Sequence, residues 1–245
     1  MKTGKYARLI LATVLLSFSV TGVLADVNID VDAKQSLQQS FDHDFLCGMQ
    51  FYLSSHIQTE VAANALRKYA PQLGVKFIKL WDPQNTIFTG TQPSDITNSA
   101  CYKWDKIDDI ILACKENNIK IMWTCAVFPE VLLDPNHKAL DDPPADENLD
   151  YLEEYIYRIM KHITGTGYDP DAGNCLGYQV DYVNIGNEIN GQVAWNTNSL
   201  WTKDRLNKVY DYAVHGITRA DNNIKVGGFM TAPMGPPSPT CYVDW

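Results

Sequence analysis

Residues 102–128, YKWDKIDDIILACKENNIKIMWTCAVF, contain the pattern that decides the fold. Apolar side chains recur at helical spacing from Trp104 to Cys114, so residues 102–117 are predicted to form a helix. The short apolar run over residues 119–128 predicts a strand that follows this helix almost directly. A helix followed at once by a buried strand is the repeating unit of an α/β protein with a parallel sheet.

The same alternation extends along the chain in both directions. Strands are predicted at 45–52, 75–80, 119–128, 182–186 and 224–230, and helices at 59–70, 102–117, 149–163 and 203–220. Two architectures fit this order, a doubly wound open sheet and a (β/α)8 TIM barrel. The first strand, GMQFY at its end, is not followed by a glycine-rich phosphate loop, and this disfavours the nucleotide-binding open sheet. Polar and aromatic groups at successive strand ends favour the mouth of a barrel.

The length of the chain bears on how much of a barrel it contains. The 245 residues hold five predicted strands at about 45 residues per unit, and eight such units need about 360 residues. We therefore expect the N-terminal part of a larger barrel, ending after about five strands. The alternative is a complete, smaller α/β domain.

The first 25 residues have the pattern of a signal peptide. Lys2, Lys5 and Arg8 precede an apolar run over residues 9–23, and Ala25 is a small residue at the expected cleavage site. The alternative is a membrane anchor, for which the run is short. We predict a secreted or periplasmic protein of residues 26–245, with no membrane contact after cleavage.

Composition and charge exclude several classes of function. The chain is 45% hydrophobic with a net charge of -9, which is typical of a globular protein that does not bind nucleic acid. Its six cysteines permit disulfides in an exported protein but do not select a pairing. The histidines are scattered and no HExxH or CxxC motif occurs, so we expect neither a metal ion nor another cofactor.

The segment 181–190, DYVNIGNEIN, carries the strongest sign of chemistry. An apolar strand delivers Asn187 and Glu188 to its carboxyl end. A carboxyl group in a partly dry pocket has a raised pKa and acts as an acid near neutral pH. An amide beside it can hydrogen-bond a sugar hydroxyl, and glycoside cleavage needs such an acid together with a second carboxylate. The alternative is that both residues merely cap a helix.

Residues 185–190, IGNEIN, resemble the Asn-Glu signature on the fourth strand of the clan A glycoside hydrolases, which are (β/α)8 barrels acting on β-linked glycans. Three further segments are similar to glycoside hydrolase family 39: KWDKID at 103–108, IKIMW with FPE at 119–123 and 128–130, and KVGG at 225–228. Residues 186–189, with Gly191 and Trp195, also resemble the family 53 endo-galactanases. The likeness covers residues 45–245.

The resemblance implies roles for individual residues. Glu188 would be the general acid/base of a retaining hydrolase, and Asn187 would bind the 2-hydroxyl of the sugar at the cleaved bond. The clan's nucleophile is a glutamate on the seventh strand, which this chain does not reach, so the chain alone is expected to be inactive. Lys79 stands where the clan commonly has an arginine, and a lysine does not replace a bidentate contact.

Further substrate contacts are expected from residues near the strand ends: Trp81, Trp123, Asn190 and Trp195. For Trp81 and Trp123 a place in the core is an equal alternative, while Trp195 and Trp201 are expected to form an exposed platform or to cap the next helix. Asp82 and Glu130 are weak candidates for a second carboxylate, because a turn and a loop or short helix explain them better. Residues 134–148 predict a long solvated loop over the mouth.

Two other classes of function remain open at this point. The first is a non-catalytic carbohydrate-binding barrel, and the second is an extracellular α/β scaffold without a sugar ligand. The sugar, its linkage and the oligomeric state are not indicated by the sequence. We take a polysaccharide or oligosaccharide as the expected partner.

Overall fold

A computed structural model describes residues 48–52, 59–81, 87–135, 142–186 and 201–228. The main strands are β1 (Gly48–Tyr52), β2 (Phe77–Trp81), β3 (Lys120–Cys125), β6 (Tyr182–Ile185) and β7 (Lys225–Gly227). The helices are α2 (Thr59–Leu73), α3 (Asp105–Glu116), α4 (Leu149–Thr164) and α6 (Lys203–Ala220). Each predicted helix and strand is therefore present, with bounds that shift by a few residues.

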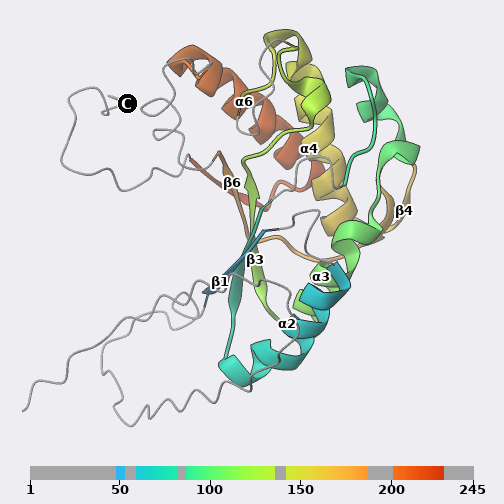
Figure 1. Cartoon of the computed structure of the whole chain (residues 1–245), viewed down its shortest axis with the longest axis vertical. Helices are drawn as coiled ribbons and strands as arrows, with labels where there is room; N and C mark the ends of the chain where they lie inside the picture. Colours follow the sequence, from blue (N-terminus) through green and yellow to red (C-terminus); the bar gives the residue numbers. More distant parts are fainter. Residues whose placement is uncertain (1–47, 53–58, 82–86, 136–141, 187–200, 229–245) are drawn as a thin grey trace, which may run out of the picture. The chain divides into compact units, whose positions relative to one another are not determined.

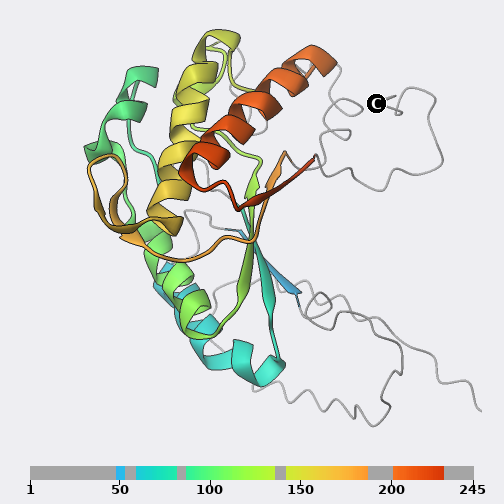
Figure 2. The ribbon, with the colours of Figure 1, turned by 180° about the vertical axis from the view of Figure 1, so that it is seen from behind.

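The five strands form one parallel sheet in the order β1-β2-β3-β6-β7. The order of these strands across the sheet is therefore the same as their order along the chain, and it never reverses. The helices all lie on the same side of this sheet, as the two opposite views agree (Figures 1 and 2). A doubly wound sheet reverses its order and carries helices on both faces, whereas a (β/α)8 barrel does neither.

The hydrophobic core lies between the sheet and the helices. Successive side chains of a strand point to opposite faces, and one alternate set is almost entirely apolar and buried. Its members are Ile78, Leu80, Ile121, Trp123, Cys125, Val183 and Ile185, each at most 3% exposed. The inward faces of α3, α4 and α6 complete this core with isoleucine, leucine and valine side chains.

The buried side of α2 agrees only in part with the apolar face that its sequence predicts. Helical spacing puts Val61, Ala62, Ala65, Leu66 and Tyr69 on one face. Ala62 and Leu66 are buried as this predicts, whereas Val61 and Tyr69 are 60% and 47% exposed. Ala63 joins Ala62 and Leu66 on the buried side of α2.

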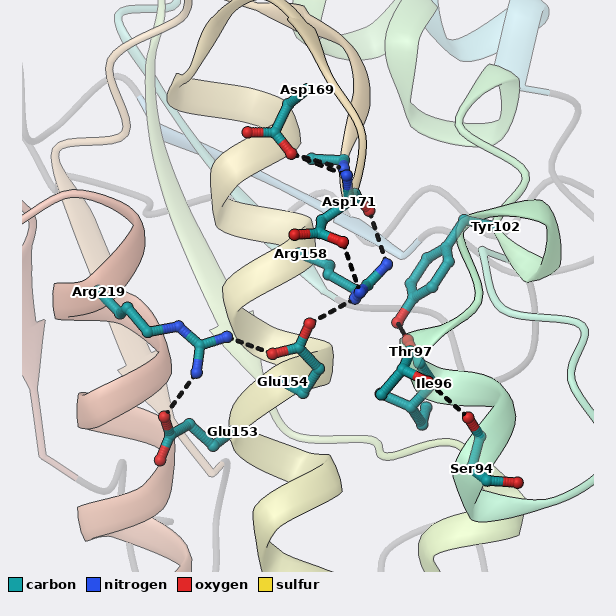
Figure 3. Close-up of polar contacts among 11 residues, drawn as sticks. Ser94, Ile96, Thr97, Tyr102, Glu153, Glu154, Arg158, Asp169, Asp171 and Arg219 are labelled. Carbon is teal, nitrogen blue, oxygen red and sulfur yellow. Dashed lines mark hydrogen bonds and ion pairs between the residues drawn. The ribbon is translucent and has the colours of Figure 1, made fainter.

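A two-stranded hairpin that the sequence pattern did not predict follows α4. It consists of β4 (Thr166–Asp169) and β5 (Gly173–Leu176), which pair antiparallel. Asp169 Oδ1 closes its turn by accepting hydrogen bonds from the backbone nitrogens of Asp171 and Ala172, at 2.9 and 3.1 Å. The hairpin is held to α4 by Arg158, which donates to the backbone oxygen and the carboxylate of Asp171, at 2.9 and 3.0 Å (Figure 3).

A buried histidine on α4 connects the turn of the hairpin to α3. His162 is 1% exposed, and its ring nitrogens lie 2.8 Å from the backbone oxygen of Ala172 and 2.8 Å from Asp108 Oδ1 on α3. Its ring stacks on Trp104 with centroids 4.1 Å apart, and Trp104 in turn stacks on Tyr102. Trp104 is therefore a packing residue.

Part of the loop between β3 and α4 is packed rather than solvated. Residues 142–145 are buried, and Pro144 forms an isolated bridge with Leu133. Asn148 is also buried and donates to the backbone oxygen of Leu132 at 3.1 Å. The expectation of a solvated loop was therefore wrong for this part, and residues 136–141 lie outside the described ranges.

The cysteines and the hydropathy of the helices give two further results. Cys101, Cys114 and Cys175 are free thiols, while Cys47 and Cys241 lie outside the described residues. Within the ranges that the structure describes, no helix is long and apolar enough to cross a membrane. The predicted signal peptide, residues 1–25, also lies outside these ranges.

Candidate functional site

The carboxyl ends of β2, β3 and β6 present a row of three neighbouring side chains. Trp81 pairs with Thr124, and Thr124 pairs with Asn184, so these residues lie side by side across the sheet. They belong to the face of the sheet opposite the helices, because the intervening residues are those of the helix-side core. In a barrel this is the inner face, and its carboxyl edge is where functional groups gather.

Two of these side chains form a buried polar chain that reaches the end of β6. The Thr124 hydroxyl donates to Asn184 Oδ1 at 2.8 Å, and Asn184 Nδ2 donates to the backbone oxygen of Gly186 at 2.7 Å. Thr124 is fully buried and Asn184 is 5% exposed. Sequence reasoning missed both, since neither residue type signals a site and they are far apart in the chain.

Two residues before Trp81 on β2, the inner face of the sheet carries a buried cation, Lys79. Lys79 is 8% exposed, and its Nζ lies 4.8 Å from the centroid of the Trp81 ring. A cation at this distance from an indole is attracted by the negative face of the ring. The structure thus places Trp81 and Lys79 together on the inner face of the sheet.

Trp123 lies on the other face. It is fully buried and pairs in register with Leu80 on one side and Val183 on the other. Its Nε1 is a buried donor without a hydrogen-bond partner among the described residues. This placement favours the core alternative for Trp123 and removes it from the candidate sugar contacts.

The residues expected to act in catalysis or to bind the sugar come after Gly186, the last described residue at the carboxyl edge of the sheet. Asn187, Glu188, Asn190 and Trp195 lie outside the described residues, as does Asp82. Gly186, directly before Asn187, is described. Trp201 is only 7% exposed, next to Thr202, whose hydroxyl caps α6 by accepting from the Arg205 nitrogen at 3.2 Å. The burial of Trp201 contradicts the exposed platform, and the residue that caps α6 is its neighbour Thr202.

A cavity of about 710 Å³ lies among the loops that follow β2 and β3. Its polar lining includes Gln92, Glu130, Glu147 and Asn148, and its apolar lining includes Phe88 and Val131. Glu130 starts the short 3-10 helix η3 (Glu130–Leu132), as the sequence indicated. The described parts of the chain contain no group of histidine, cysteine and acidic residues that could hold a metal ion.

Comparison with known proteins gives matches in structure only. No protein-family model matches the chain, and no curated protein matches its sequence. A glucosidase from Croceicoccus marinus is similar in structure, with 16% identity, a TM-score of 0.47 and coverage of 76% of this chain and 37% of that protein.

Two further solved structures resemble the chain to a similar extent. A structure of two fungal β-1,4-galactanases has 20% identity and a TM-score of 0.42, over 67% of this chain and 45% of theirs. GH5_18 from Bifidobacterium longum has 13% identity and a TM-score of 0.47, over 75% of this chain and 43% of its own. The chain thus spans less than half the length of each of these three proteins.

The class of fold follows from the sheet itself. The protein is an α/β protein whose parallel strands and one-sided helices have the order of a (β/α)8 TIM barrel.

Proposed function

We propose that this chain is the N-terminal part of an exported glycoside hydrolase, which cleaves β-linked glycans with retention of configuration. The observation that carries the proposal is the position of Gly186. It follows β6 at the carboxyl edge of the sheet, and its nitrogen donates to the backbone oxygen of Cys125 at 2.7 Å. Asn187 and Glu188 are the next two residues, so the motif begins at the edge where a barrel carries its active site.

The chemistry requires two carboxyl groups about 5 Å apart. Glu188 gives its proton to the bridging oxygen while a glutamate carboxylate attacks the anomeric carbon, so the leaving sugar departs as an alcohol and a glycosyl-enzyme forms. Glu188, now ionised, takes a proton from water, and the water oxygen displaces the enzyme carboxylate. We propose that this nucleophile lies on a seventh strand outside the present sequence.

One described residue near the motif suits a sugar ligand, and the motif itself offers further contacts. Trp81 offers an aromatic ring on the inner face, and a ring of this kind stacks on the flat C–H face of a sugar. Asn187 would hydrogen-bond the 2-hydroxyl, with Asn190 and Trp195 as further contacts. The proposal includes no metal ion or other cofactor, and it includes export through residues 1–25.

The decisive experiment is the Glu188→Gln variant of the complete protein, assayed on aryl β-glycosides and β-linked oligosaccharides. We expect a loss of hydrolysis of roughly a hundredfold or more, since general acid–base catalysis contributes about 10² to 10⁴. Glu116→Gln is the matched control, because Glu116 is exposed on α3 and pairs only with Arg67 among the contacts described. Its hydrolysis should stay at the level of the unchanged protein.

The same experiment separates the hydrolase from a carbohydrate-binding barrel. A protein that binds the oligosaccharides without hydrolysing them, and binds equally well as Glu188→Gln, would be a binding protein. Hydrolysis that survives the substitution would refute the assignment of Glu188. The 245-residue chain alone is expected to be inactive, and turnover by it would refute an external nucleophile.

A further inference from the structure

We infer that one exposed apolar flank of α2 is a contact surface for another helix, the one that follows the last strand of the complete barrel. The flank consists of Val61, Ala65, Tyr69 and Leu73 and is called the α2 stripe below. The inference rests on the proposed function only in taking the chain as part of a larger barrel. It goes beyond that proposal by naming residues at which the ring of helices closes.

The α2 stripe is a continuous row of apolar residues four positions apart, a spacing that places side chains one above another along a helix. Val61, Tyr69 and Leu73 are 60%, 47% and 61% exposed, and Ala65 is half-buried. Three of the five large hydrophobic residues that are exposed in the described part of the chain thus lie in one row. Apolar residues that are exposed singly need no explanation, but a row of them indicates a contact surface.

The other flank of α2 is already covered by α3. Arg67 Nε lies 2.7 Å from Glu116 Oε2 of α3, and α3 is the helix that packs beside α2 on this side. Ala65 and Tyr69 are each two residues from Arg67, so at about 100° per residue they lie on the opposite side of α2. The α2 stripe therefore faces away from α3.

The sheet ends on the same side as the α2 stripe. Strand β1 is first in the strand order and, among the described strands, pairs only with β2. Helices α2 and α3 lie side by side at one end of the helix layer (Figures 1 and 2), so the side of α2 away from α3 is also the side of the outer edge of β1. A closed barrel pairs its last strand with its first, which removes this edge. The helix of that last unit then lies on the α2 stripe.

The borders of the α2 stripe favour a helix as the partner. Asn64, Lys68 and Gln72 run along its solvent side, and all three are exposed and polar. The partner therefore needs a narrow apolar face with polar residues at its rim, which is the pattern of an amphipathic helix. Rows of side chains four residues apart are also the ridges that fit into the grooves of a second helix.

The same arrangement explains why the sequence pattern of α2 is only partly matched by burial. Helical spacing groups Val61 and Tyr69 with Ala62 and Leu66, but only the latter two are buried by the described elements. The apolar face of α2 is wide enough for two partners. The sheet covers one part of this face, and we assign the other part to the last helix.

The first test is hydroxyl-radical labelling of the unaltered complete protein, read by mass spectrometry. The radical oxidises tyrosine rings according to their exposure to solvent, so Tyr69 can be compared with Tyr168, which is 75% exposed on the hairpin. We expect Tyr69 to lose most of its labelling relative to Tyr168 in the complete protein. Equal labelling of the two tyrosines would overturn the inference.

The same measurement distinguishes other occupants of the α2 stripe. Protection of Tyr69 that appears only as the protein concentration rises would mean that a second copy covers the stripe, and it would overturn the inference. Equal protection in the 245-residue chain would mean that a segment within this chain covers it, with the same consequence.

The second test compares Tyr69→Lys with Asn64→Lys in the complete protein. Both variants add one positive charge to α2, but only the first places it on the α2 stripe. A lysine beneath a packed helix is an unpaired buried charge, so we expect Tyr69→Lys to lower the thermal midpoint by roughly 5 °C or more. Asn64→Lys should change it by no more than about 1 °C, as a surface substitution does. Equal shifts would overturn the inference.

The Glu188→Gln variant keeps the two proposals distinct. If it removes hydrolysis while Tyr69 stays exposed in the complete protein, only the contact surface on α2 fails. If Tyr69 is protected while Glu188→Gln leaves hydrolysis intact, the helix contact is supported and only the catalytic assignment fails.

Discussion

The two faces of the sheet differ in chemistry although they are built from the same strands. On the helix side, the row Leu80, Trp123 and Val183 is apolar and fully buried. One residue further along each strand, the row Trp81, Thr124 and Asn184 has an indole, a hydroxyl and an amide on the inner face. A shift of one position thus separates the residues that hold the fold from those that shape the candidate site.

The difference shows that the two faces of the sheet have different physical requirements. On the helix side, each apolar atom removed from water stabilises the folded state. Hydrophobic residues of about the right size are therefore sufficient to pack this face. The inner face keeps polar groups that must each find a partner, and their geometry is specific. Substitutions should therefore affect stability on one face and activity on the other.

The largest effect is expected from truncating the helix-side row. Trp123→Ala should lower the free energy of unfolding by about 3–5 kcal/mol, because it leaves a cavity at a fully buried position. Its counterpart is Tyr182→Ala on the inner face of β6, where Tyr182 is 39% exposed, and less than about 1 kcal/mol is expected. Urea unfolding followed by circular dichroism measures both. Equal losses would contradict the contrast between the faces.

A smaller effect should follow from crowding the helix layer. A Cβ added to Gly216 on α6 would lie 2.5 Å from the backbone oxygen of Glu153 on α4, so the two helices must separate. We expect Gly216→Ala to cost about 1–3 kcal/mol of stability, as overpacking does. Gly228→Ala is the control, because a Cβ there has no atom within 4 Å. Thermal unfolding of both variants tests the prediction, and an unchanged Gly216→Ala would refute close packing of α4 on α6.

The smallest effect concerns alkaline pH. Burial raises the pKa of the Cys114 thiol from 9.0 to about 12, so the folded chain keeps a proton that the unfolded chain loses in this range. Stability is therefore complete below pH 9 and falls as the pH rises above it, by at most about 1.4 kcal/mol per pH unit. Burial also raises the pKa of Tyr178, which adds to the fall at higher pH.

Cys114→Ala should make the alkaline loss of stability less steep. Ile110→Val is the control, since Ile110 is fully buried in the same helix and does not titrate. It should lower stability at every pH without changing the slope. Unfolding in urea between pH 7 and pH 11 gives both slopes, and identical slopes for Cys114→Ala and the unchanged chain would contradict the burial of this thiol.

Local patterns predicted most of the fold. Helix α6 was expected at residues 203–220 and runs from Lys203 to Ala220. The prediction succeeded because helical periodicity depends only on residues that are close together in the sequence. The β4–β5 hairpin was missed because TGYD and GNCL are short and contain glycine, and neither alternates in the manner of a strand.

The candidate site was less accessible from the sequence. The Asn187-Glu188 motif was noticed from its residue types, and its role remains a prediction. Thr124 and Asn184 could not be paired in advance, because they are 60 residues apart and only the register of β3 and β6 brings them together. Without this register, the sequence could not distinguish a core position from a sugar contact for Trp81 and Trp123. The register pairs Trp81 with Thr124 and Leu80 with Trp123, so the two tryptophans lie on opposite faces of the sheet.

The contact between Arg158 and the hairpin belongs to a longer row of charged side chains that joins α6, α4 and the hairpin. Arg219 on α6 contacts Glu153 and Glu154 on α4, and Glu154 contacts Arg158, which in turn holds Asp171 in the hairpin (Figure 3). Positive and negative groups therefore alternate along this row, which runs from α6 across α4 to the hairpin. If α6 slid along α4 by one turn, about 5.4 Å, Arg219 would approach Arg158 or lose its carboxylates. The row therefore favours the observed alignment of α6 on α4 over an alignment shifted by one turn.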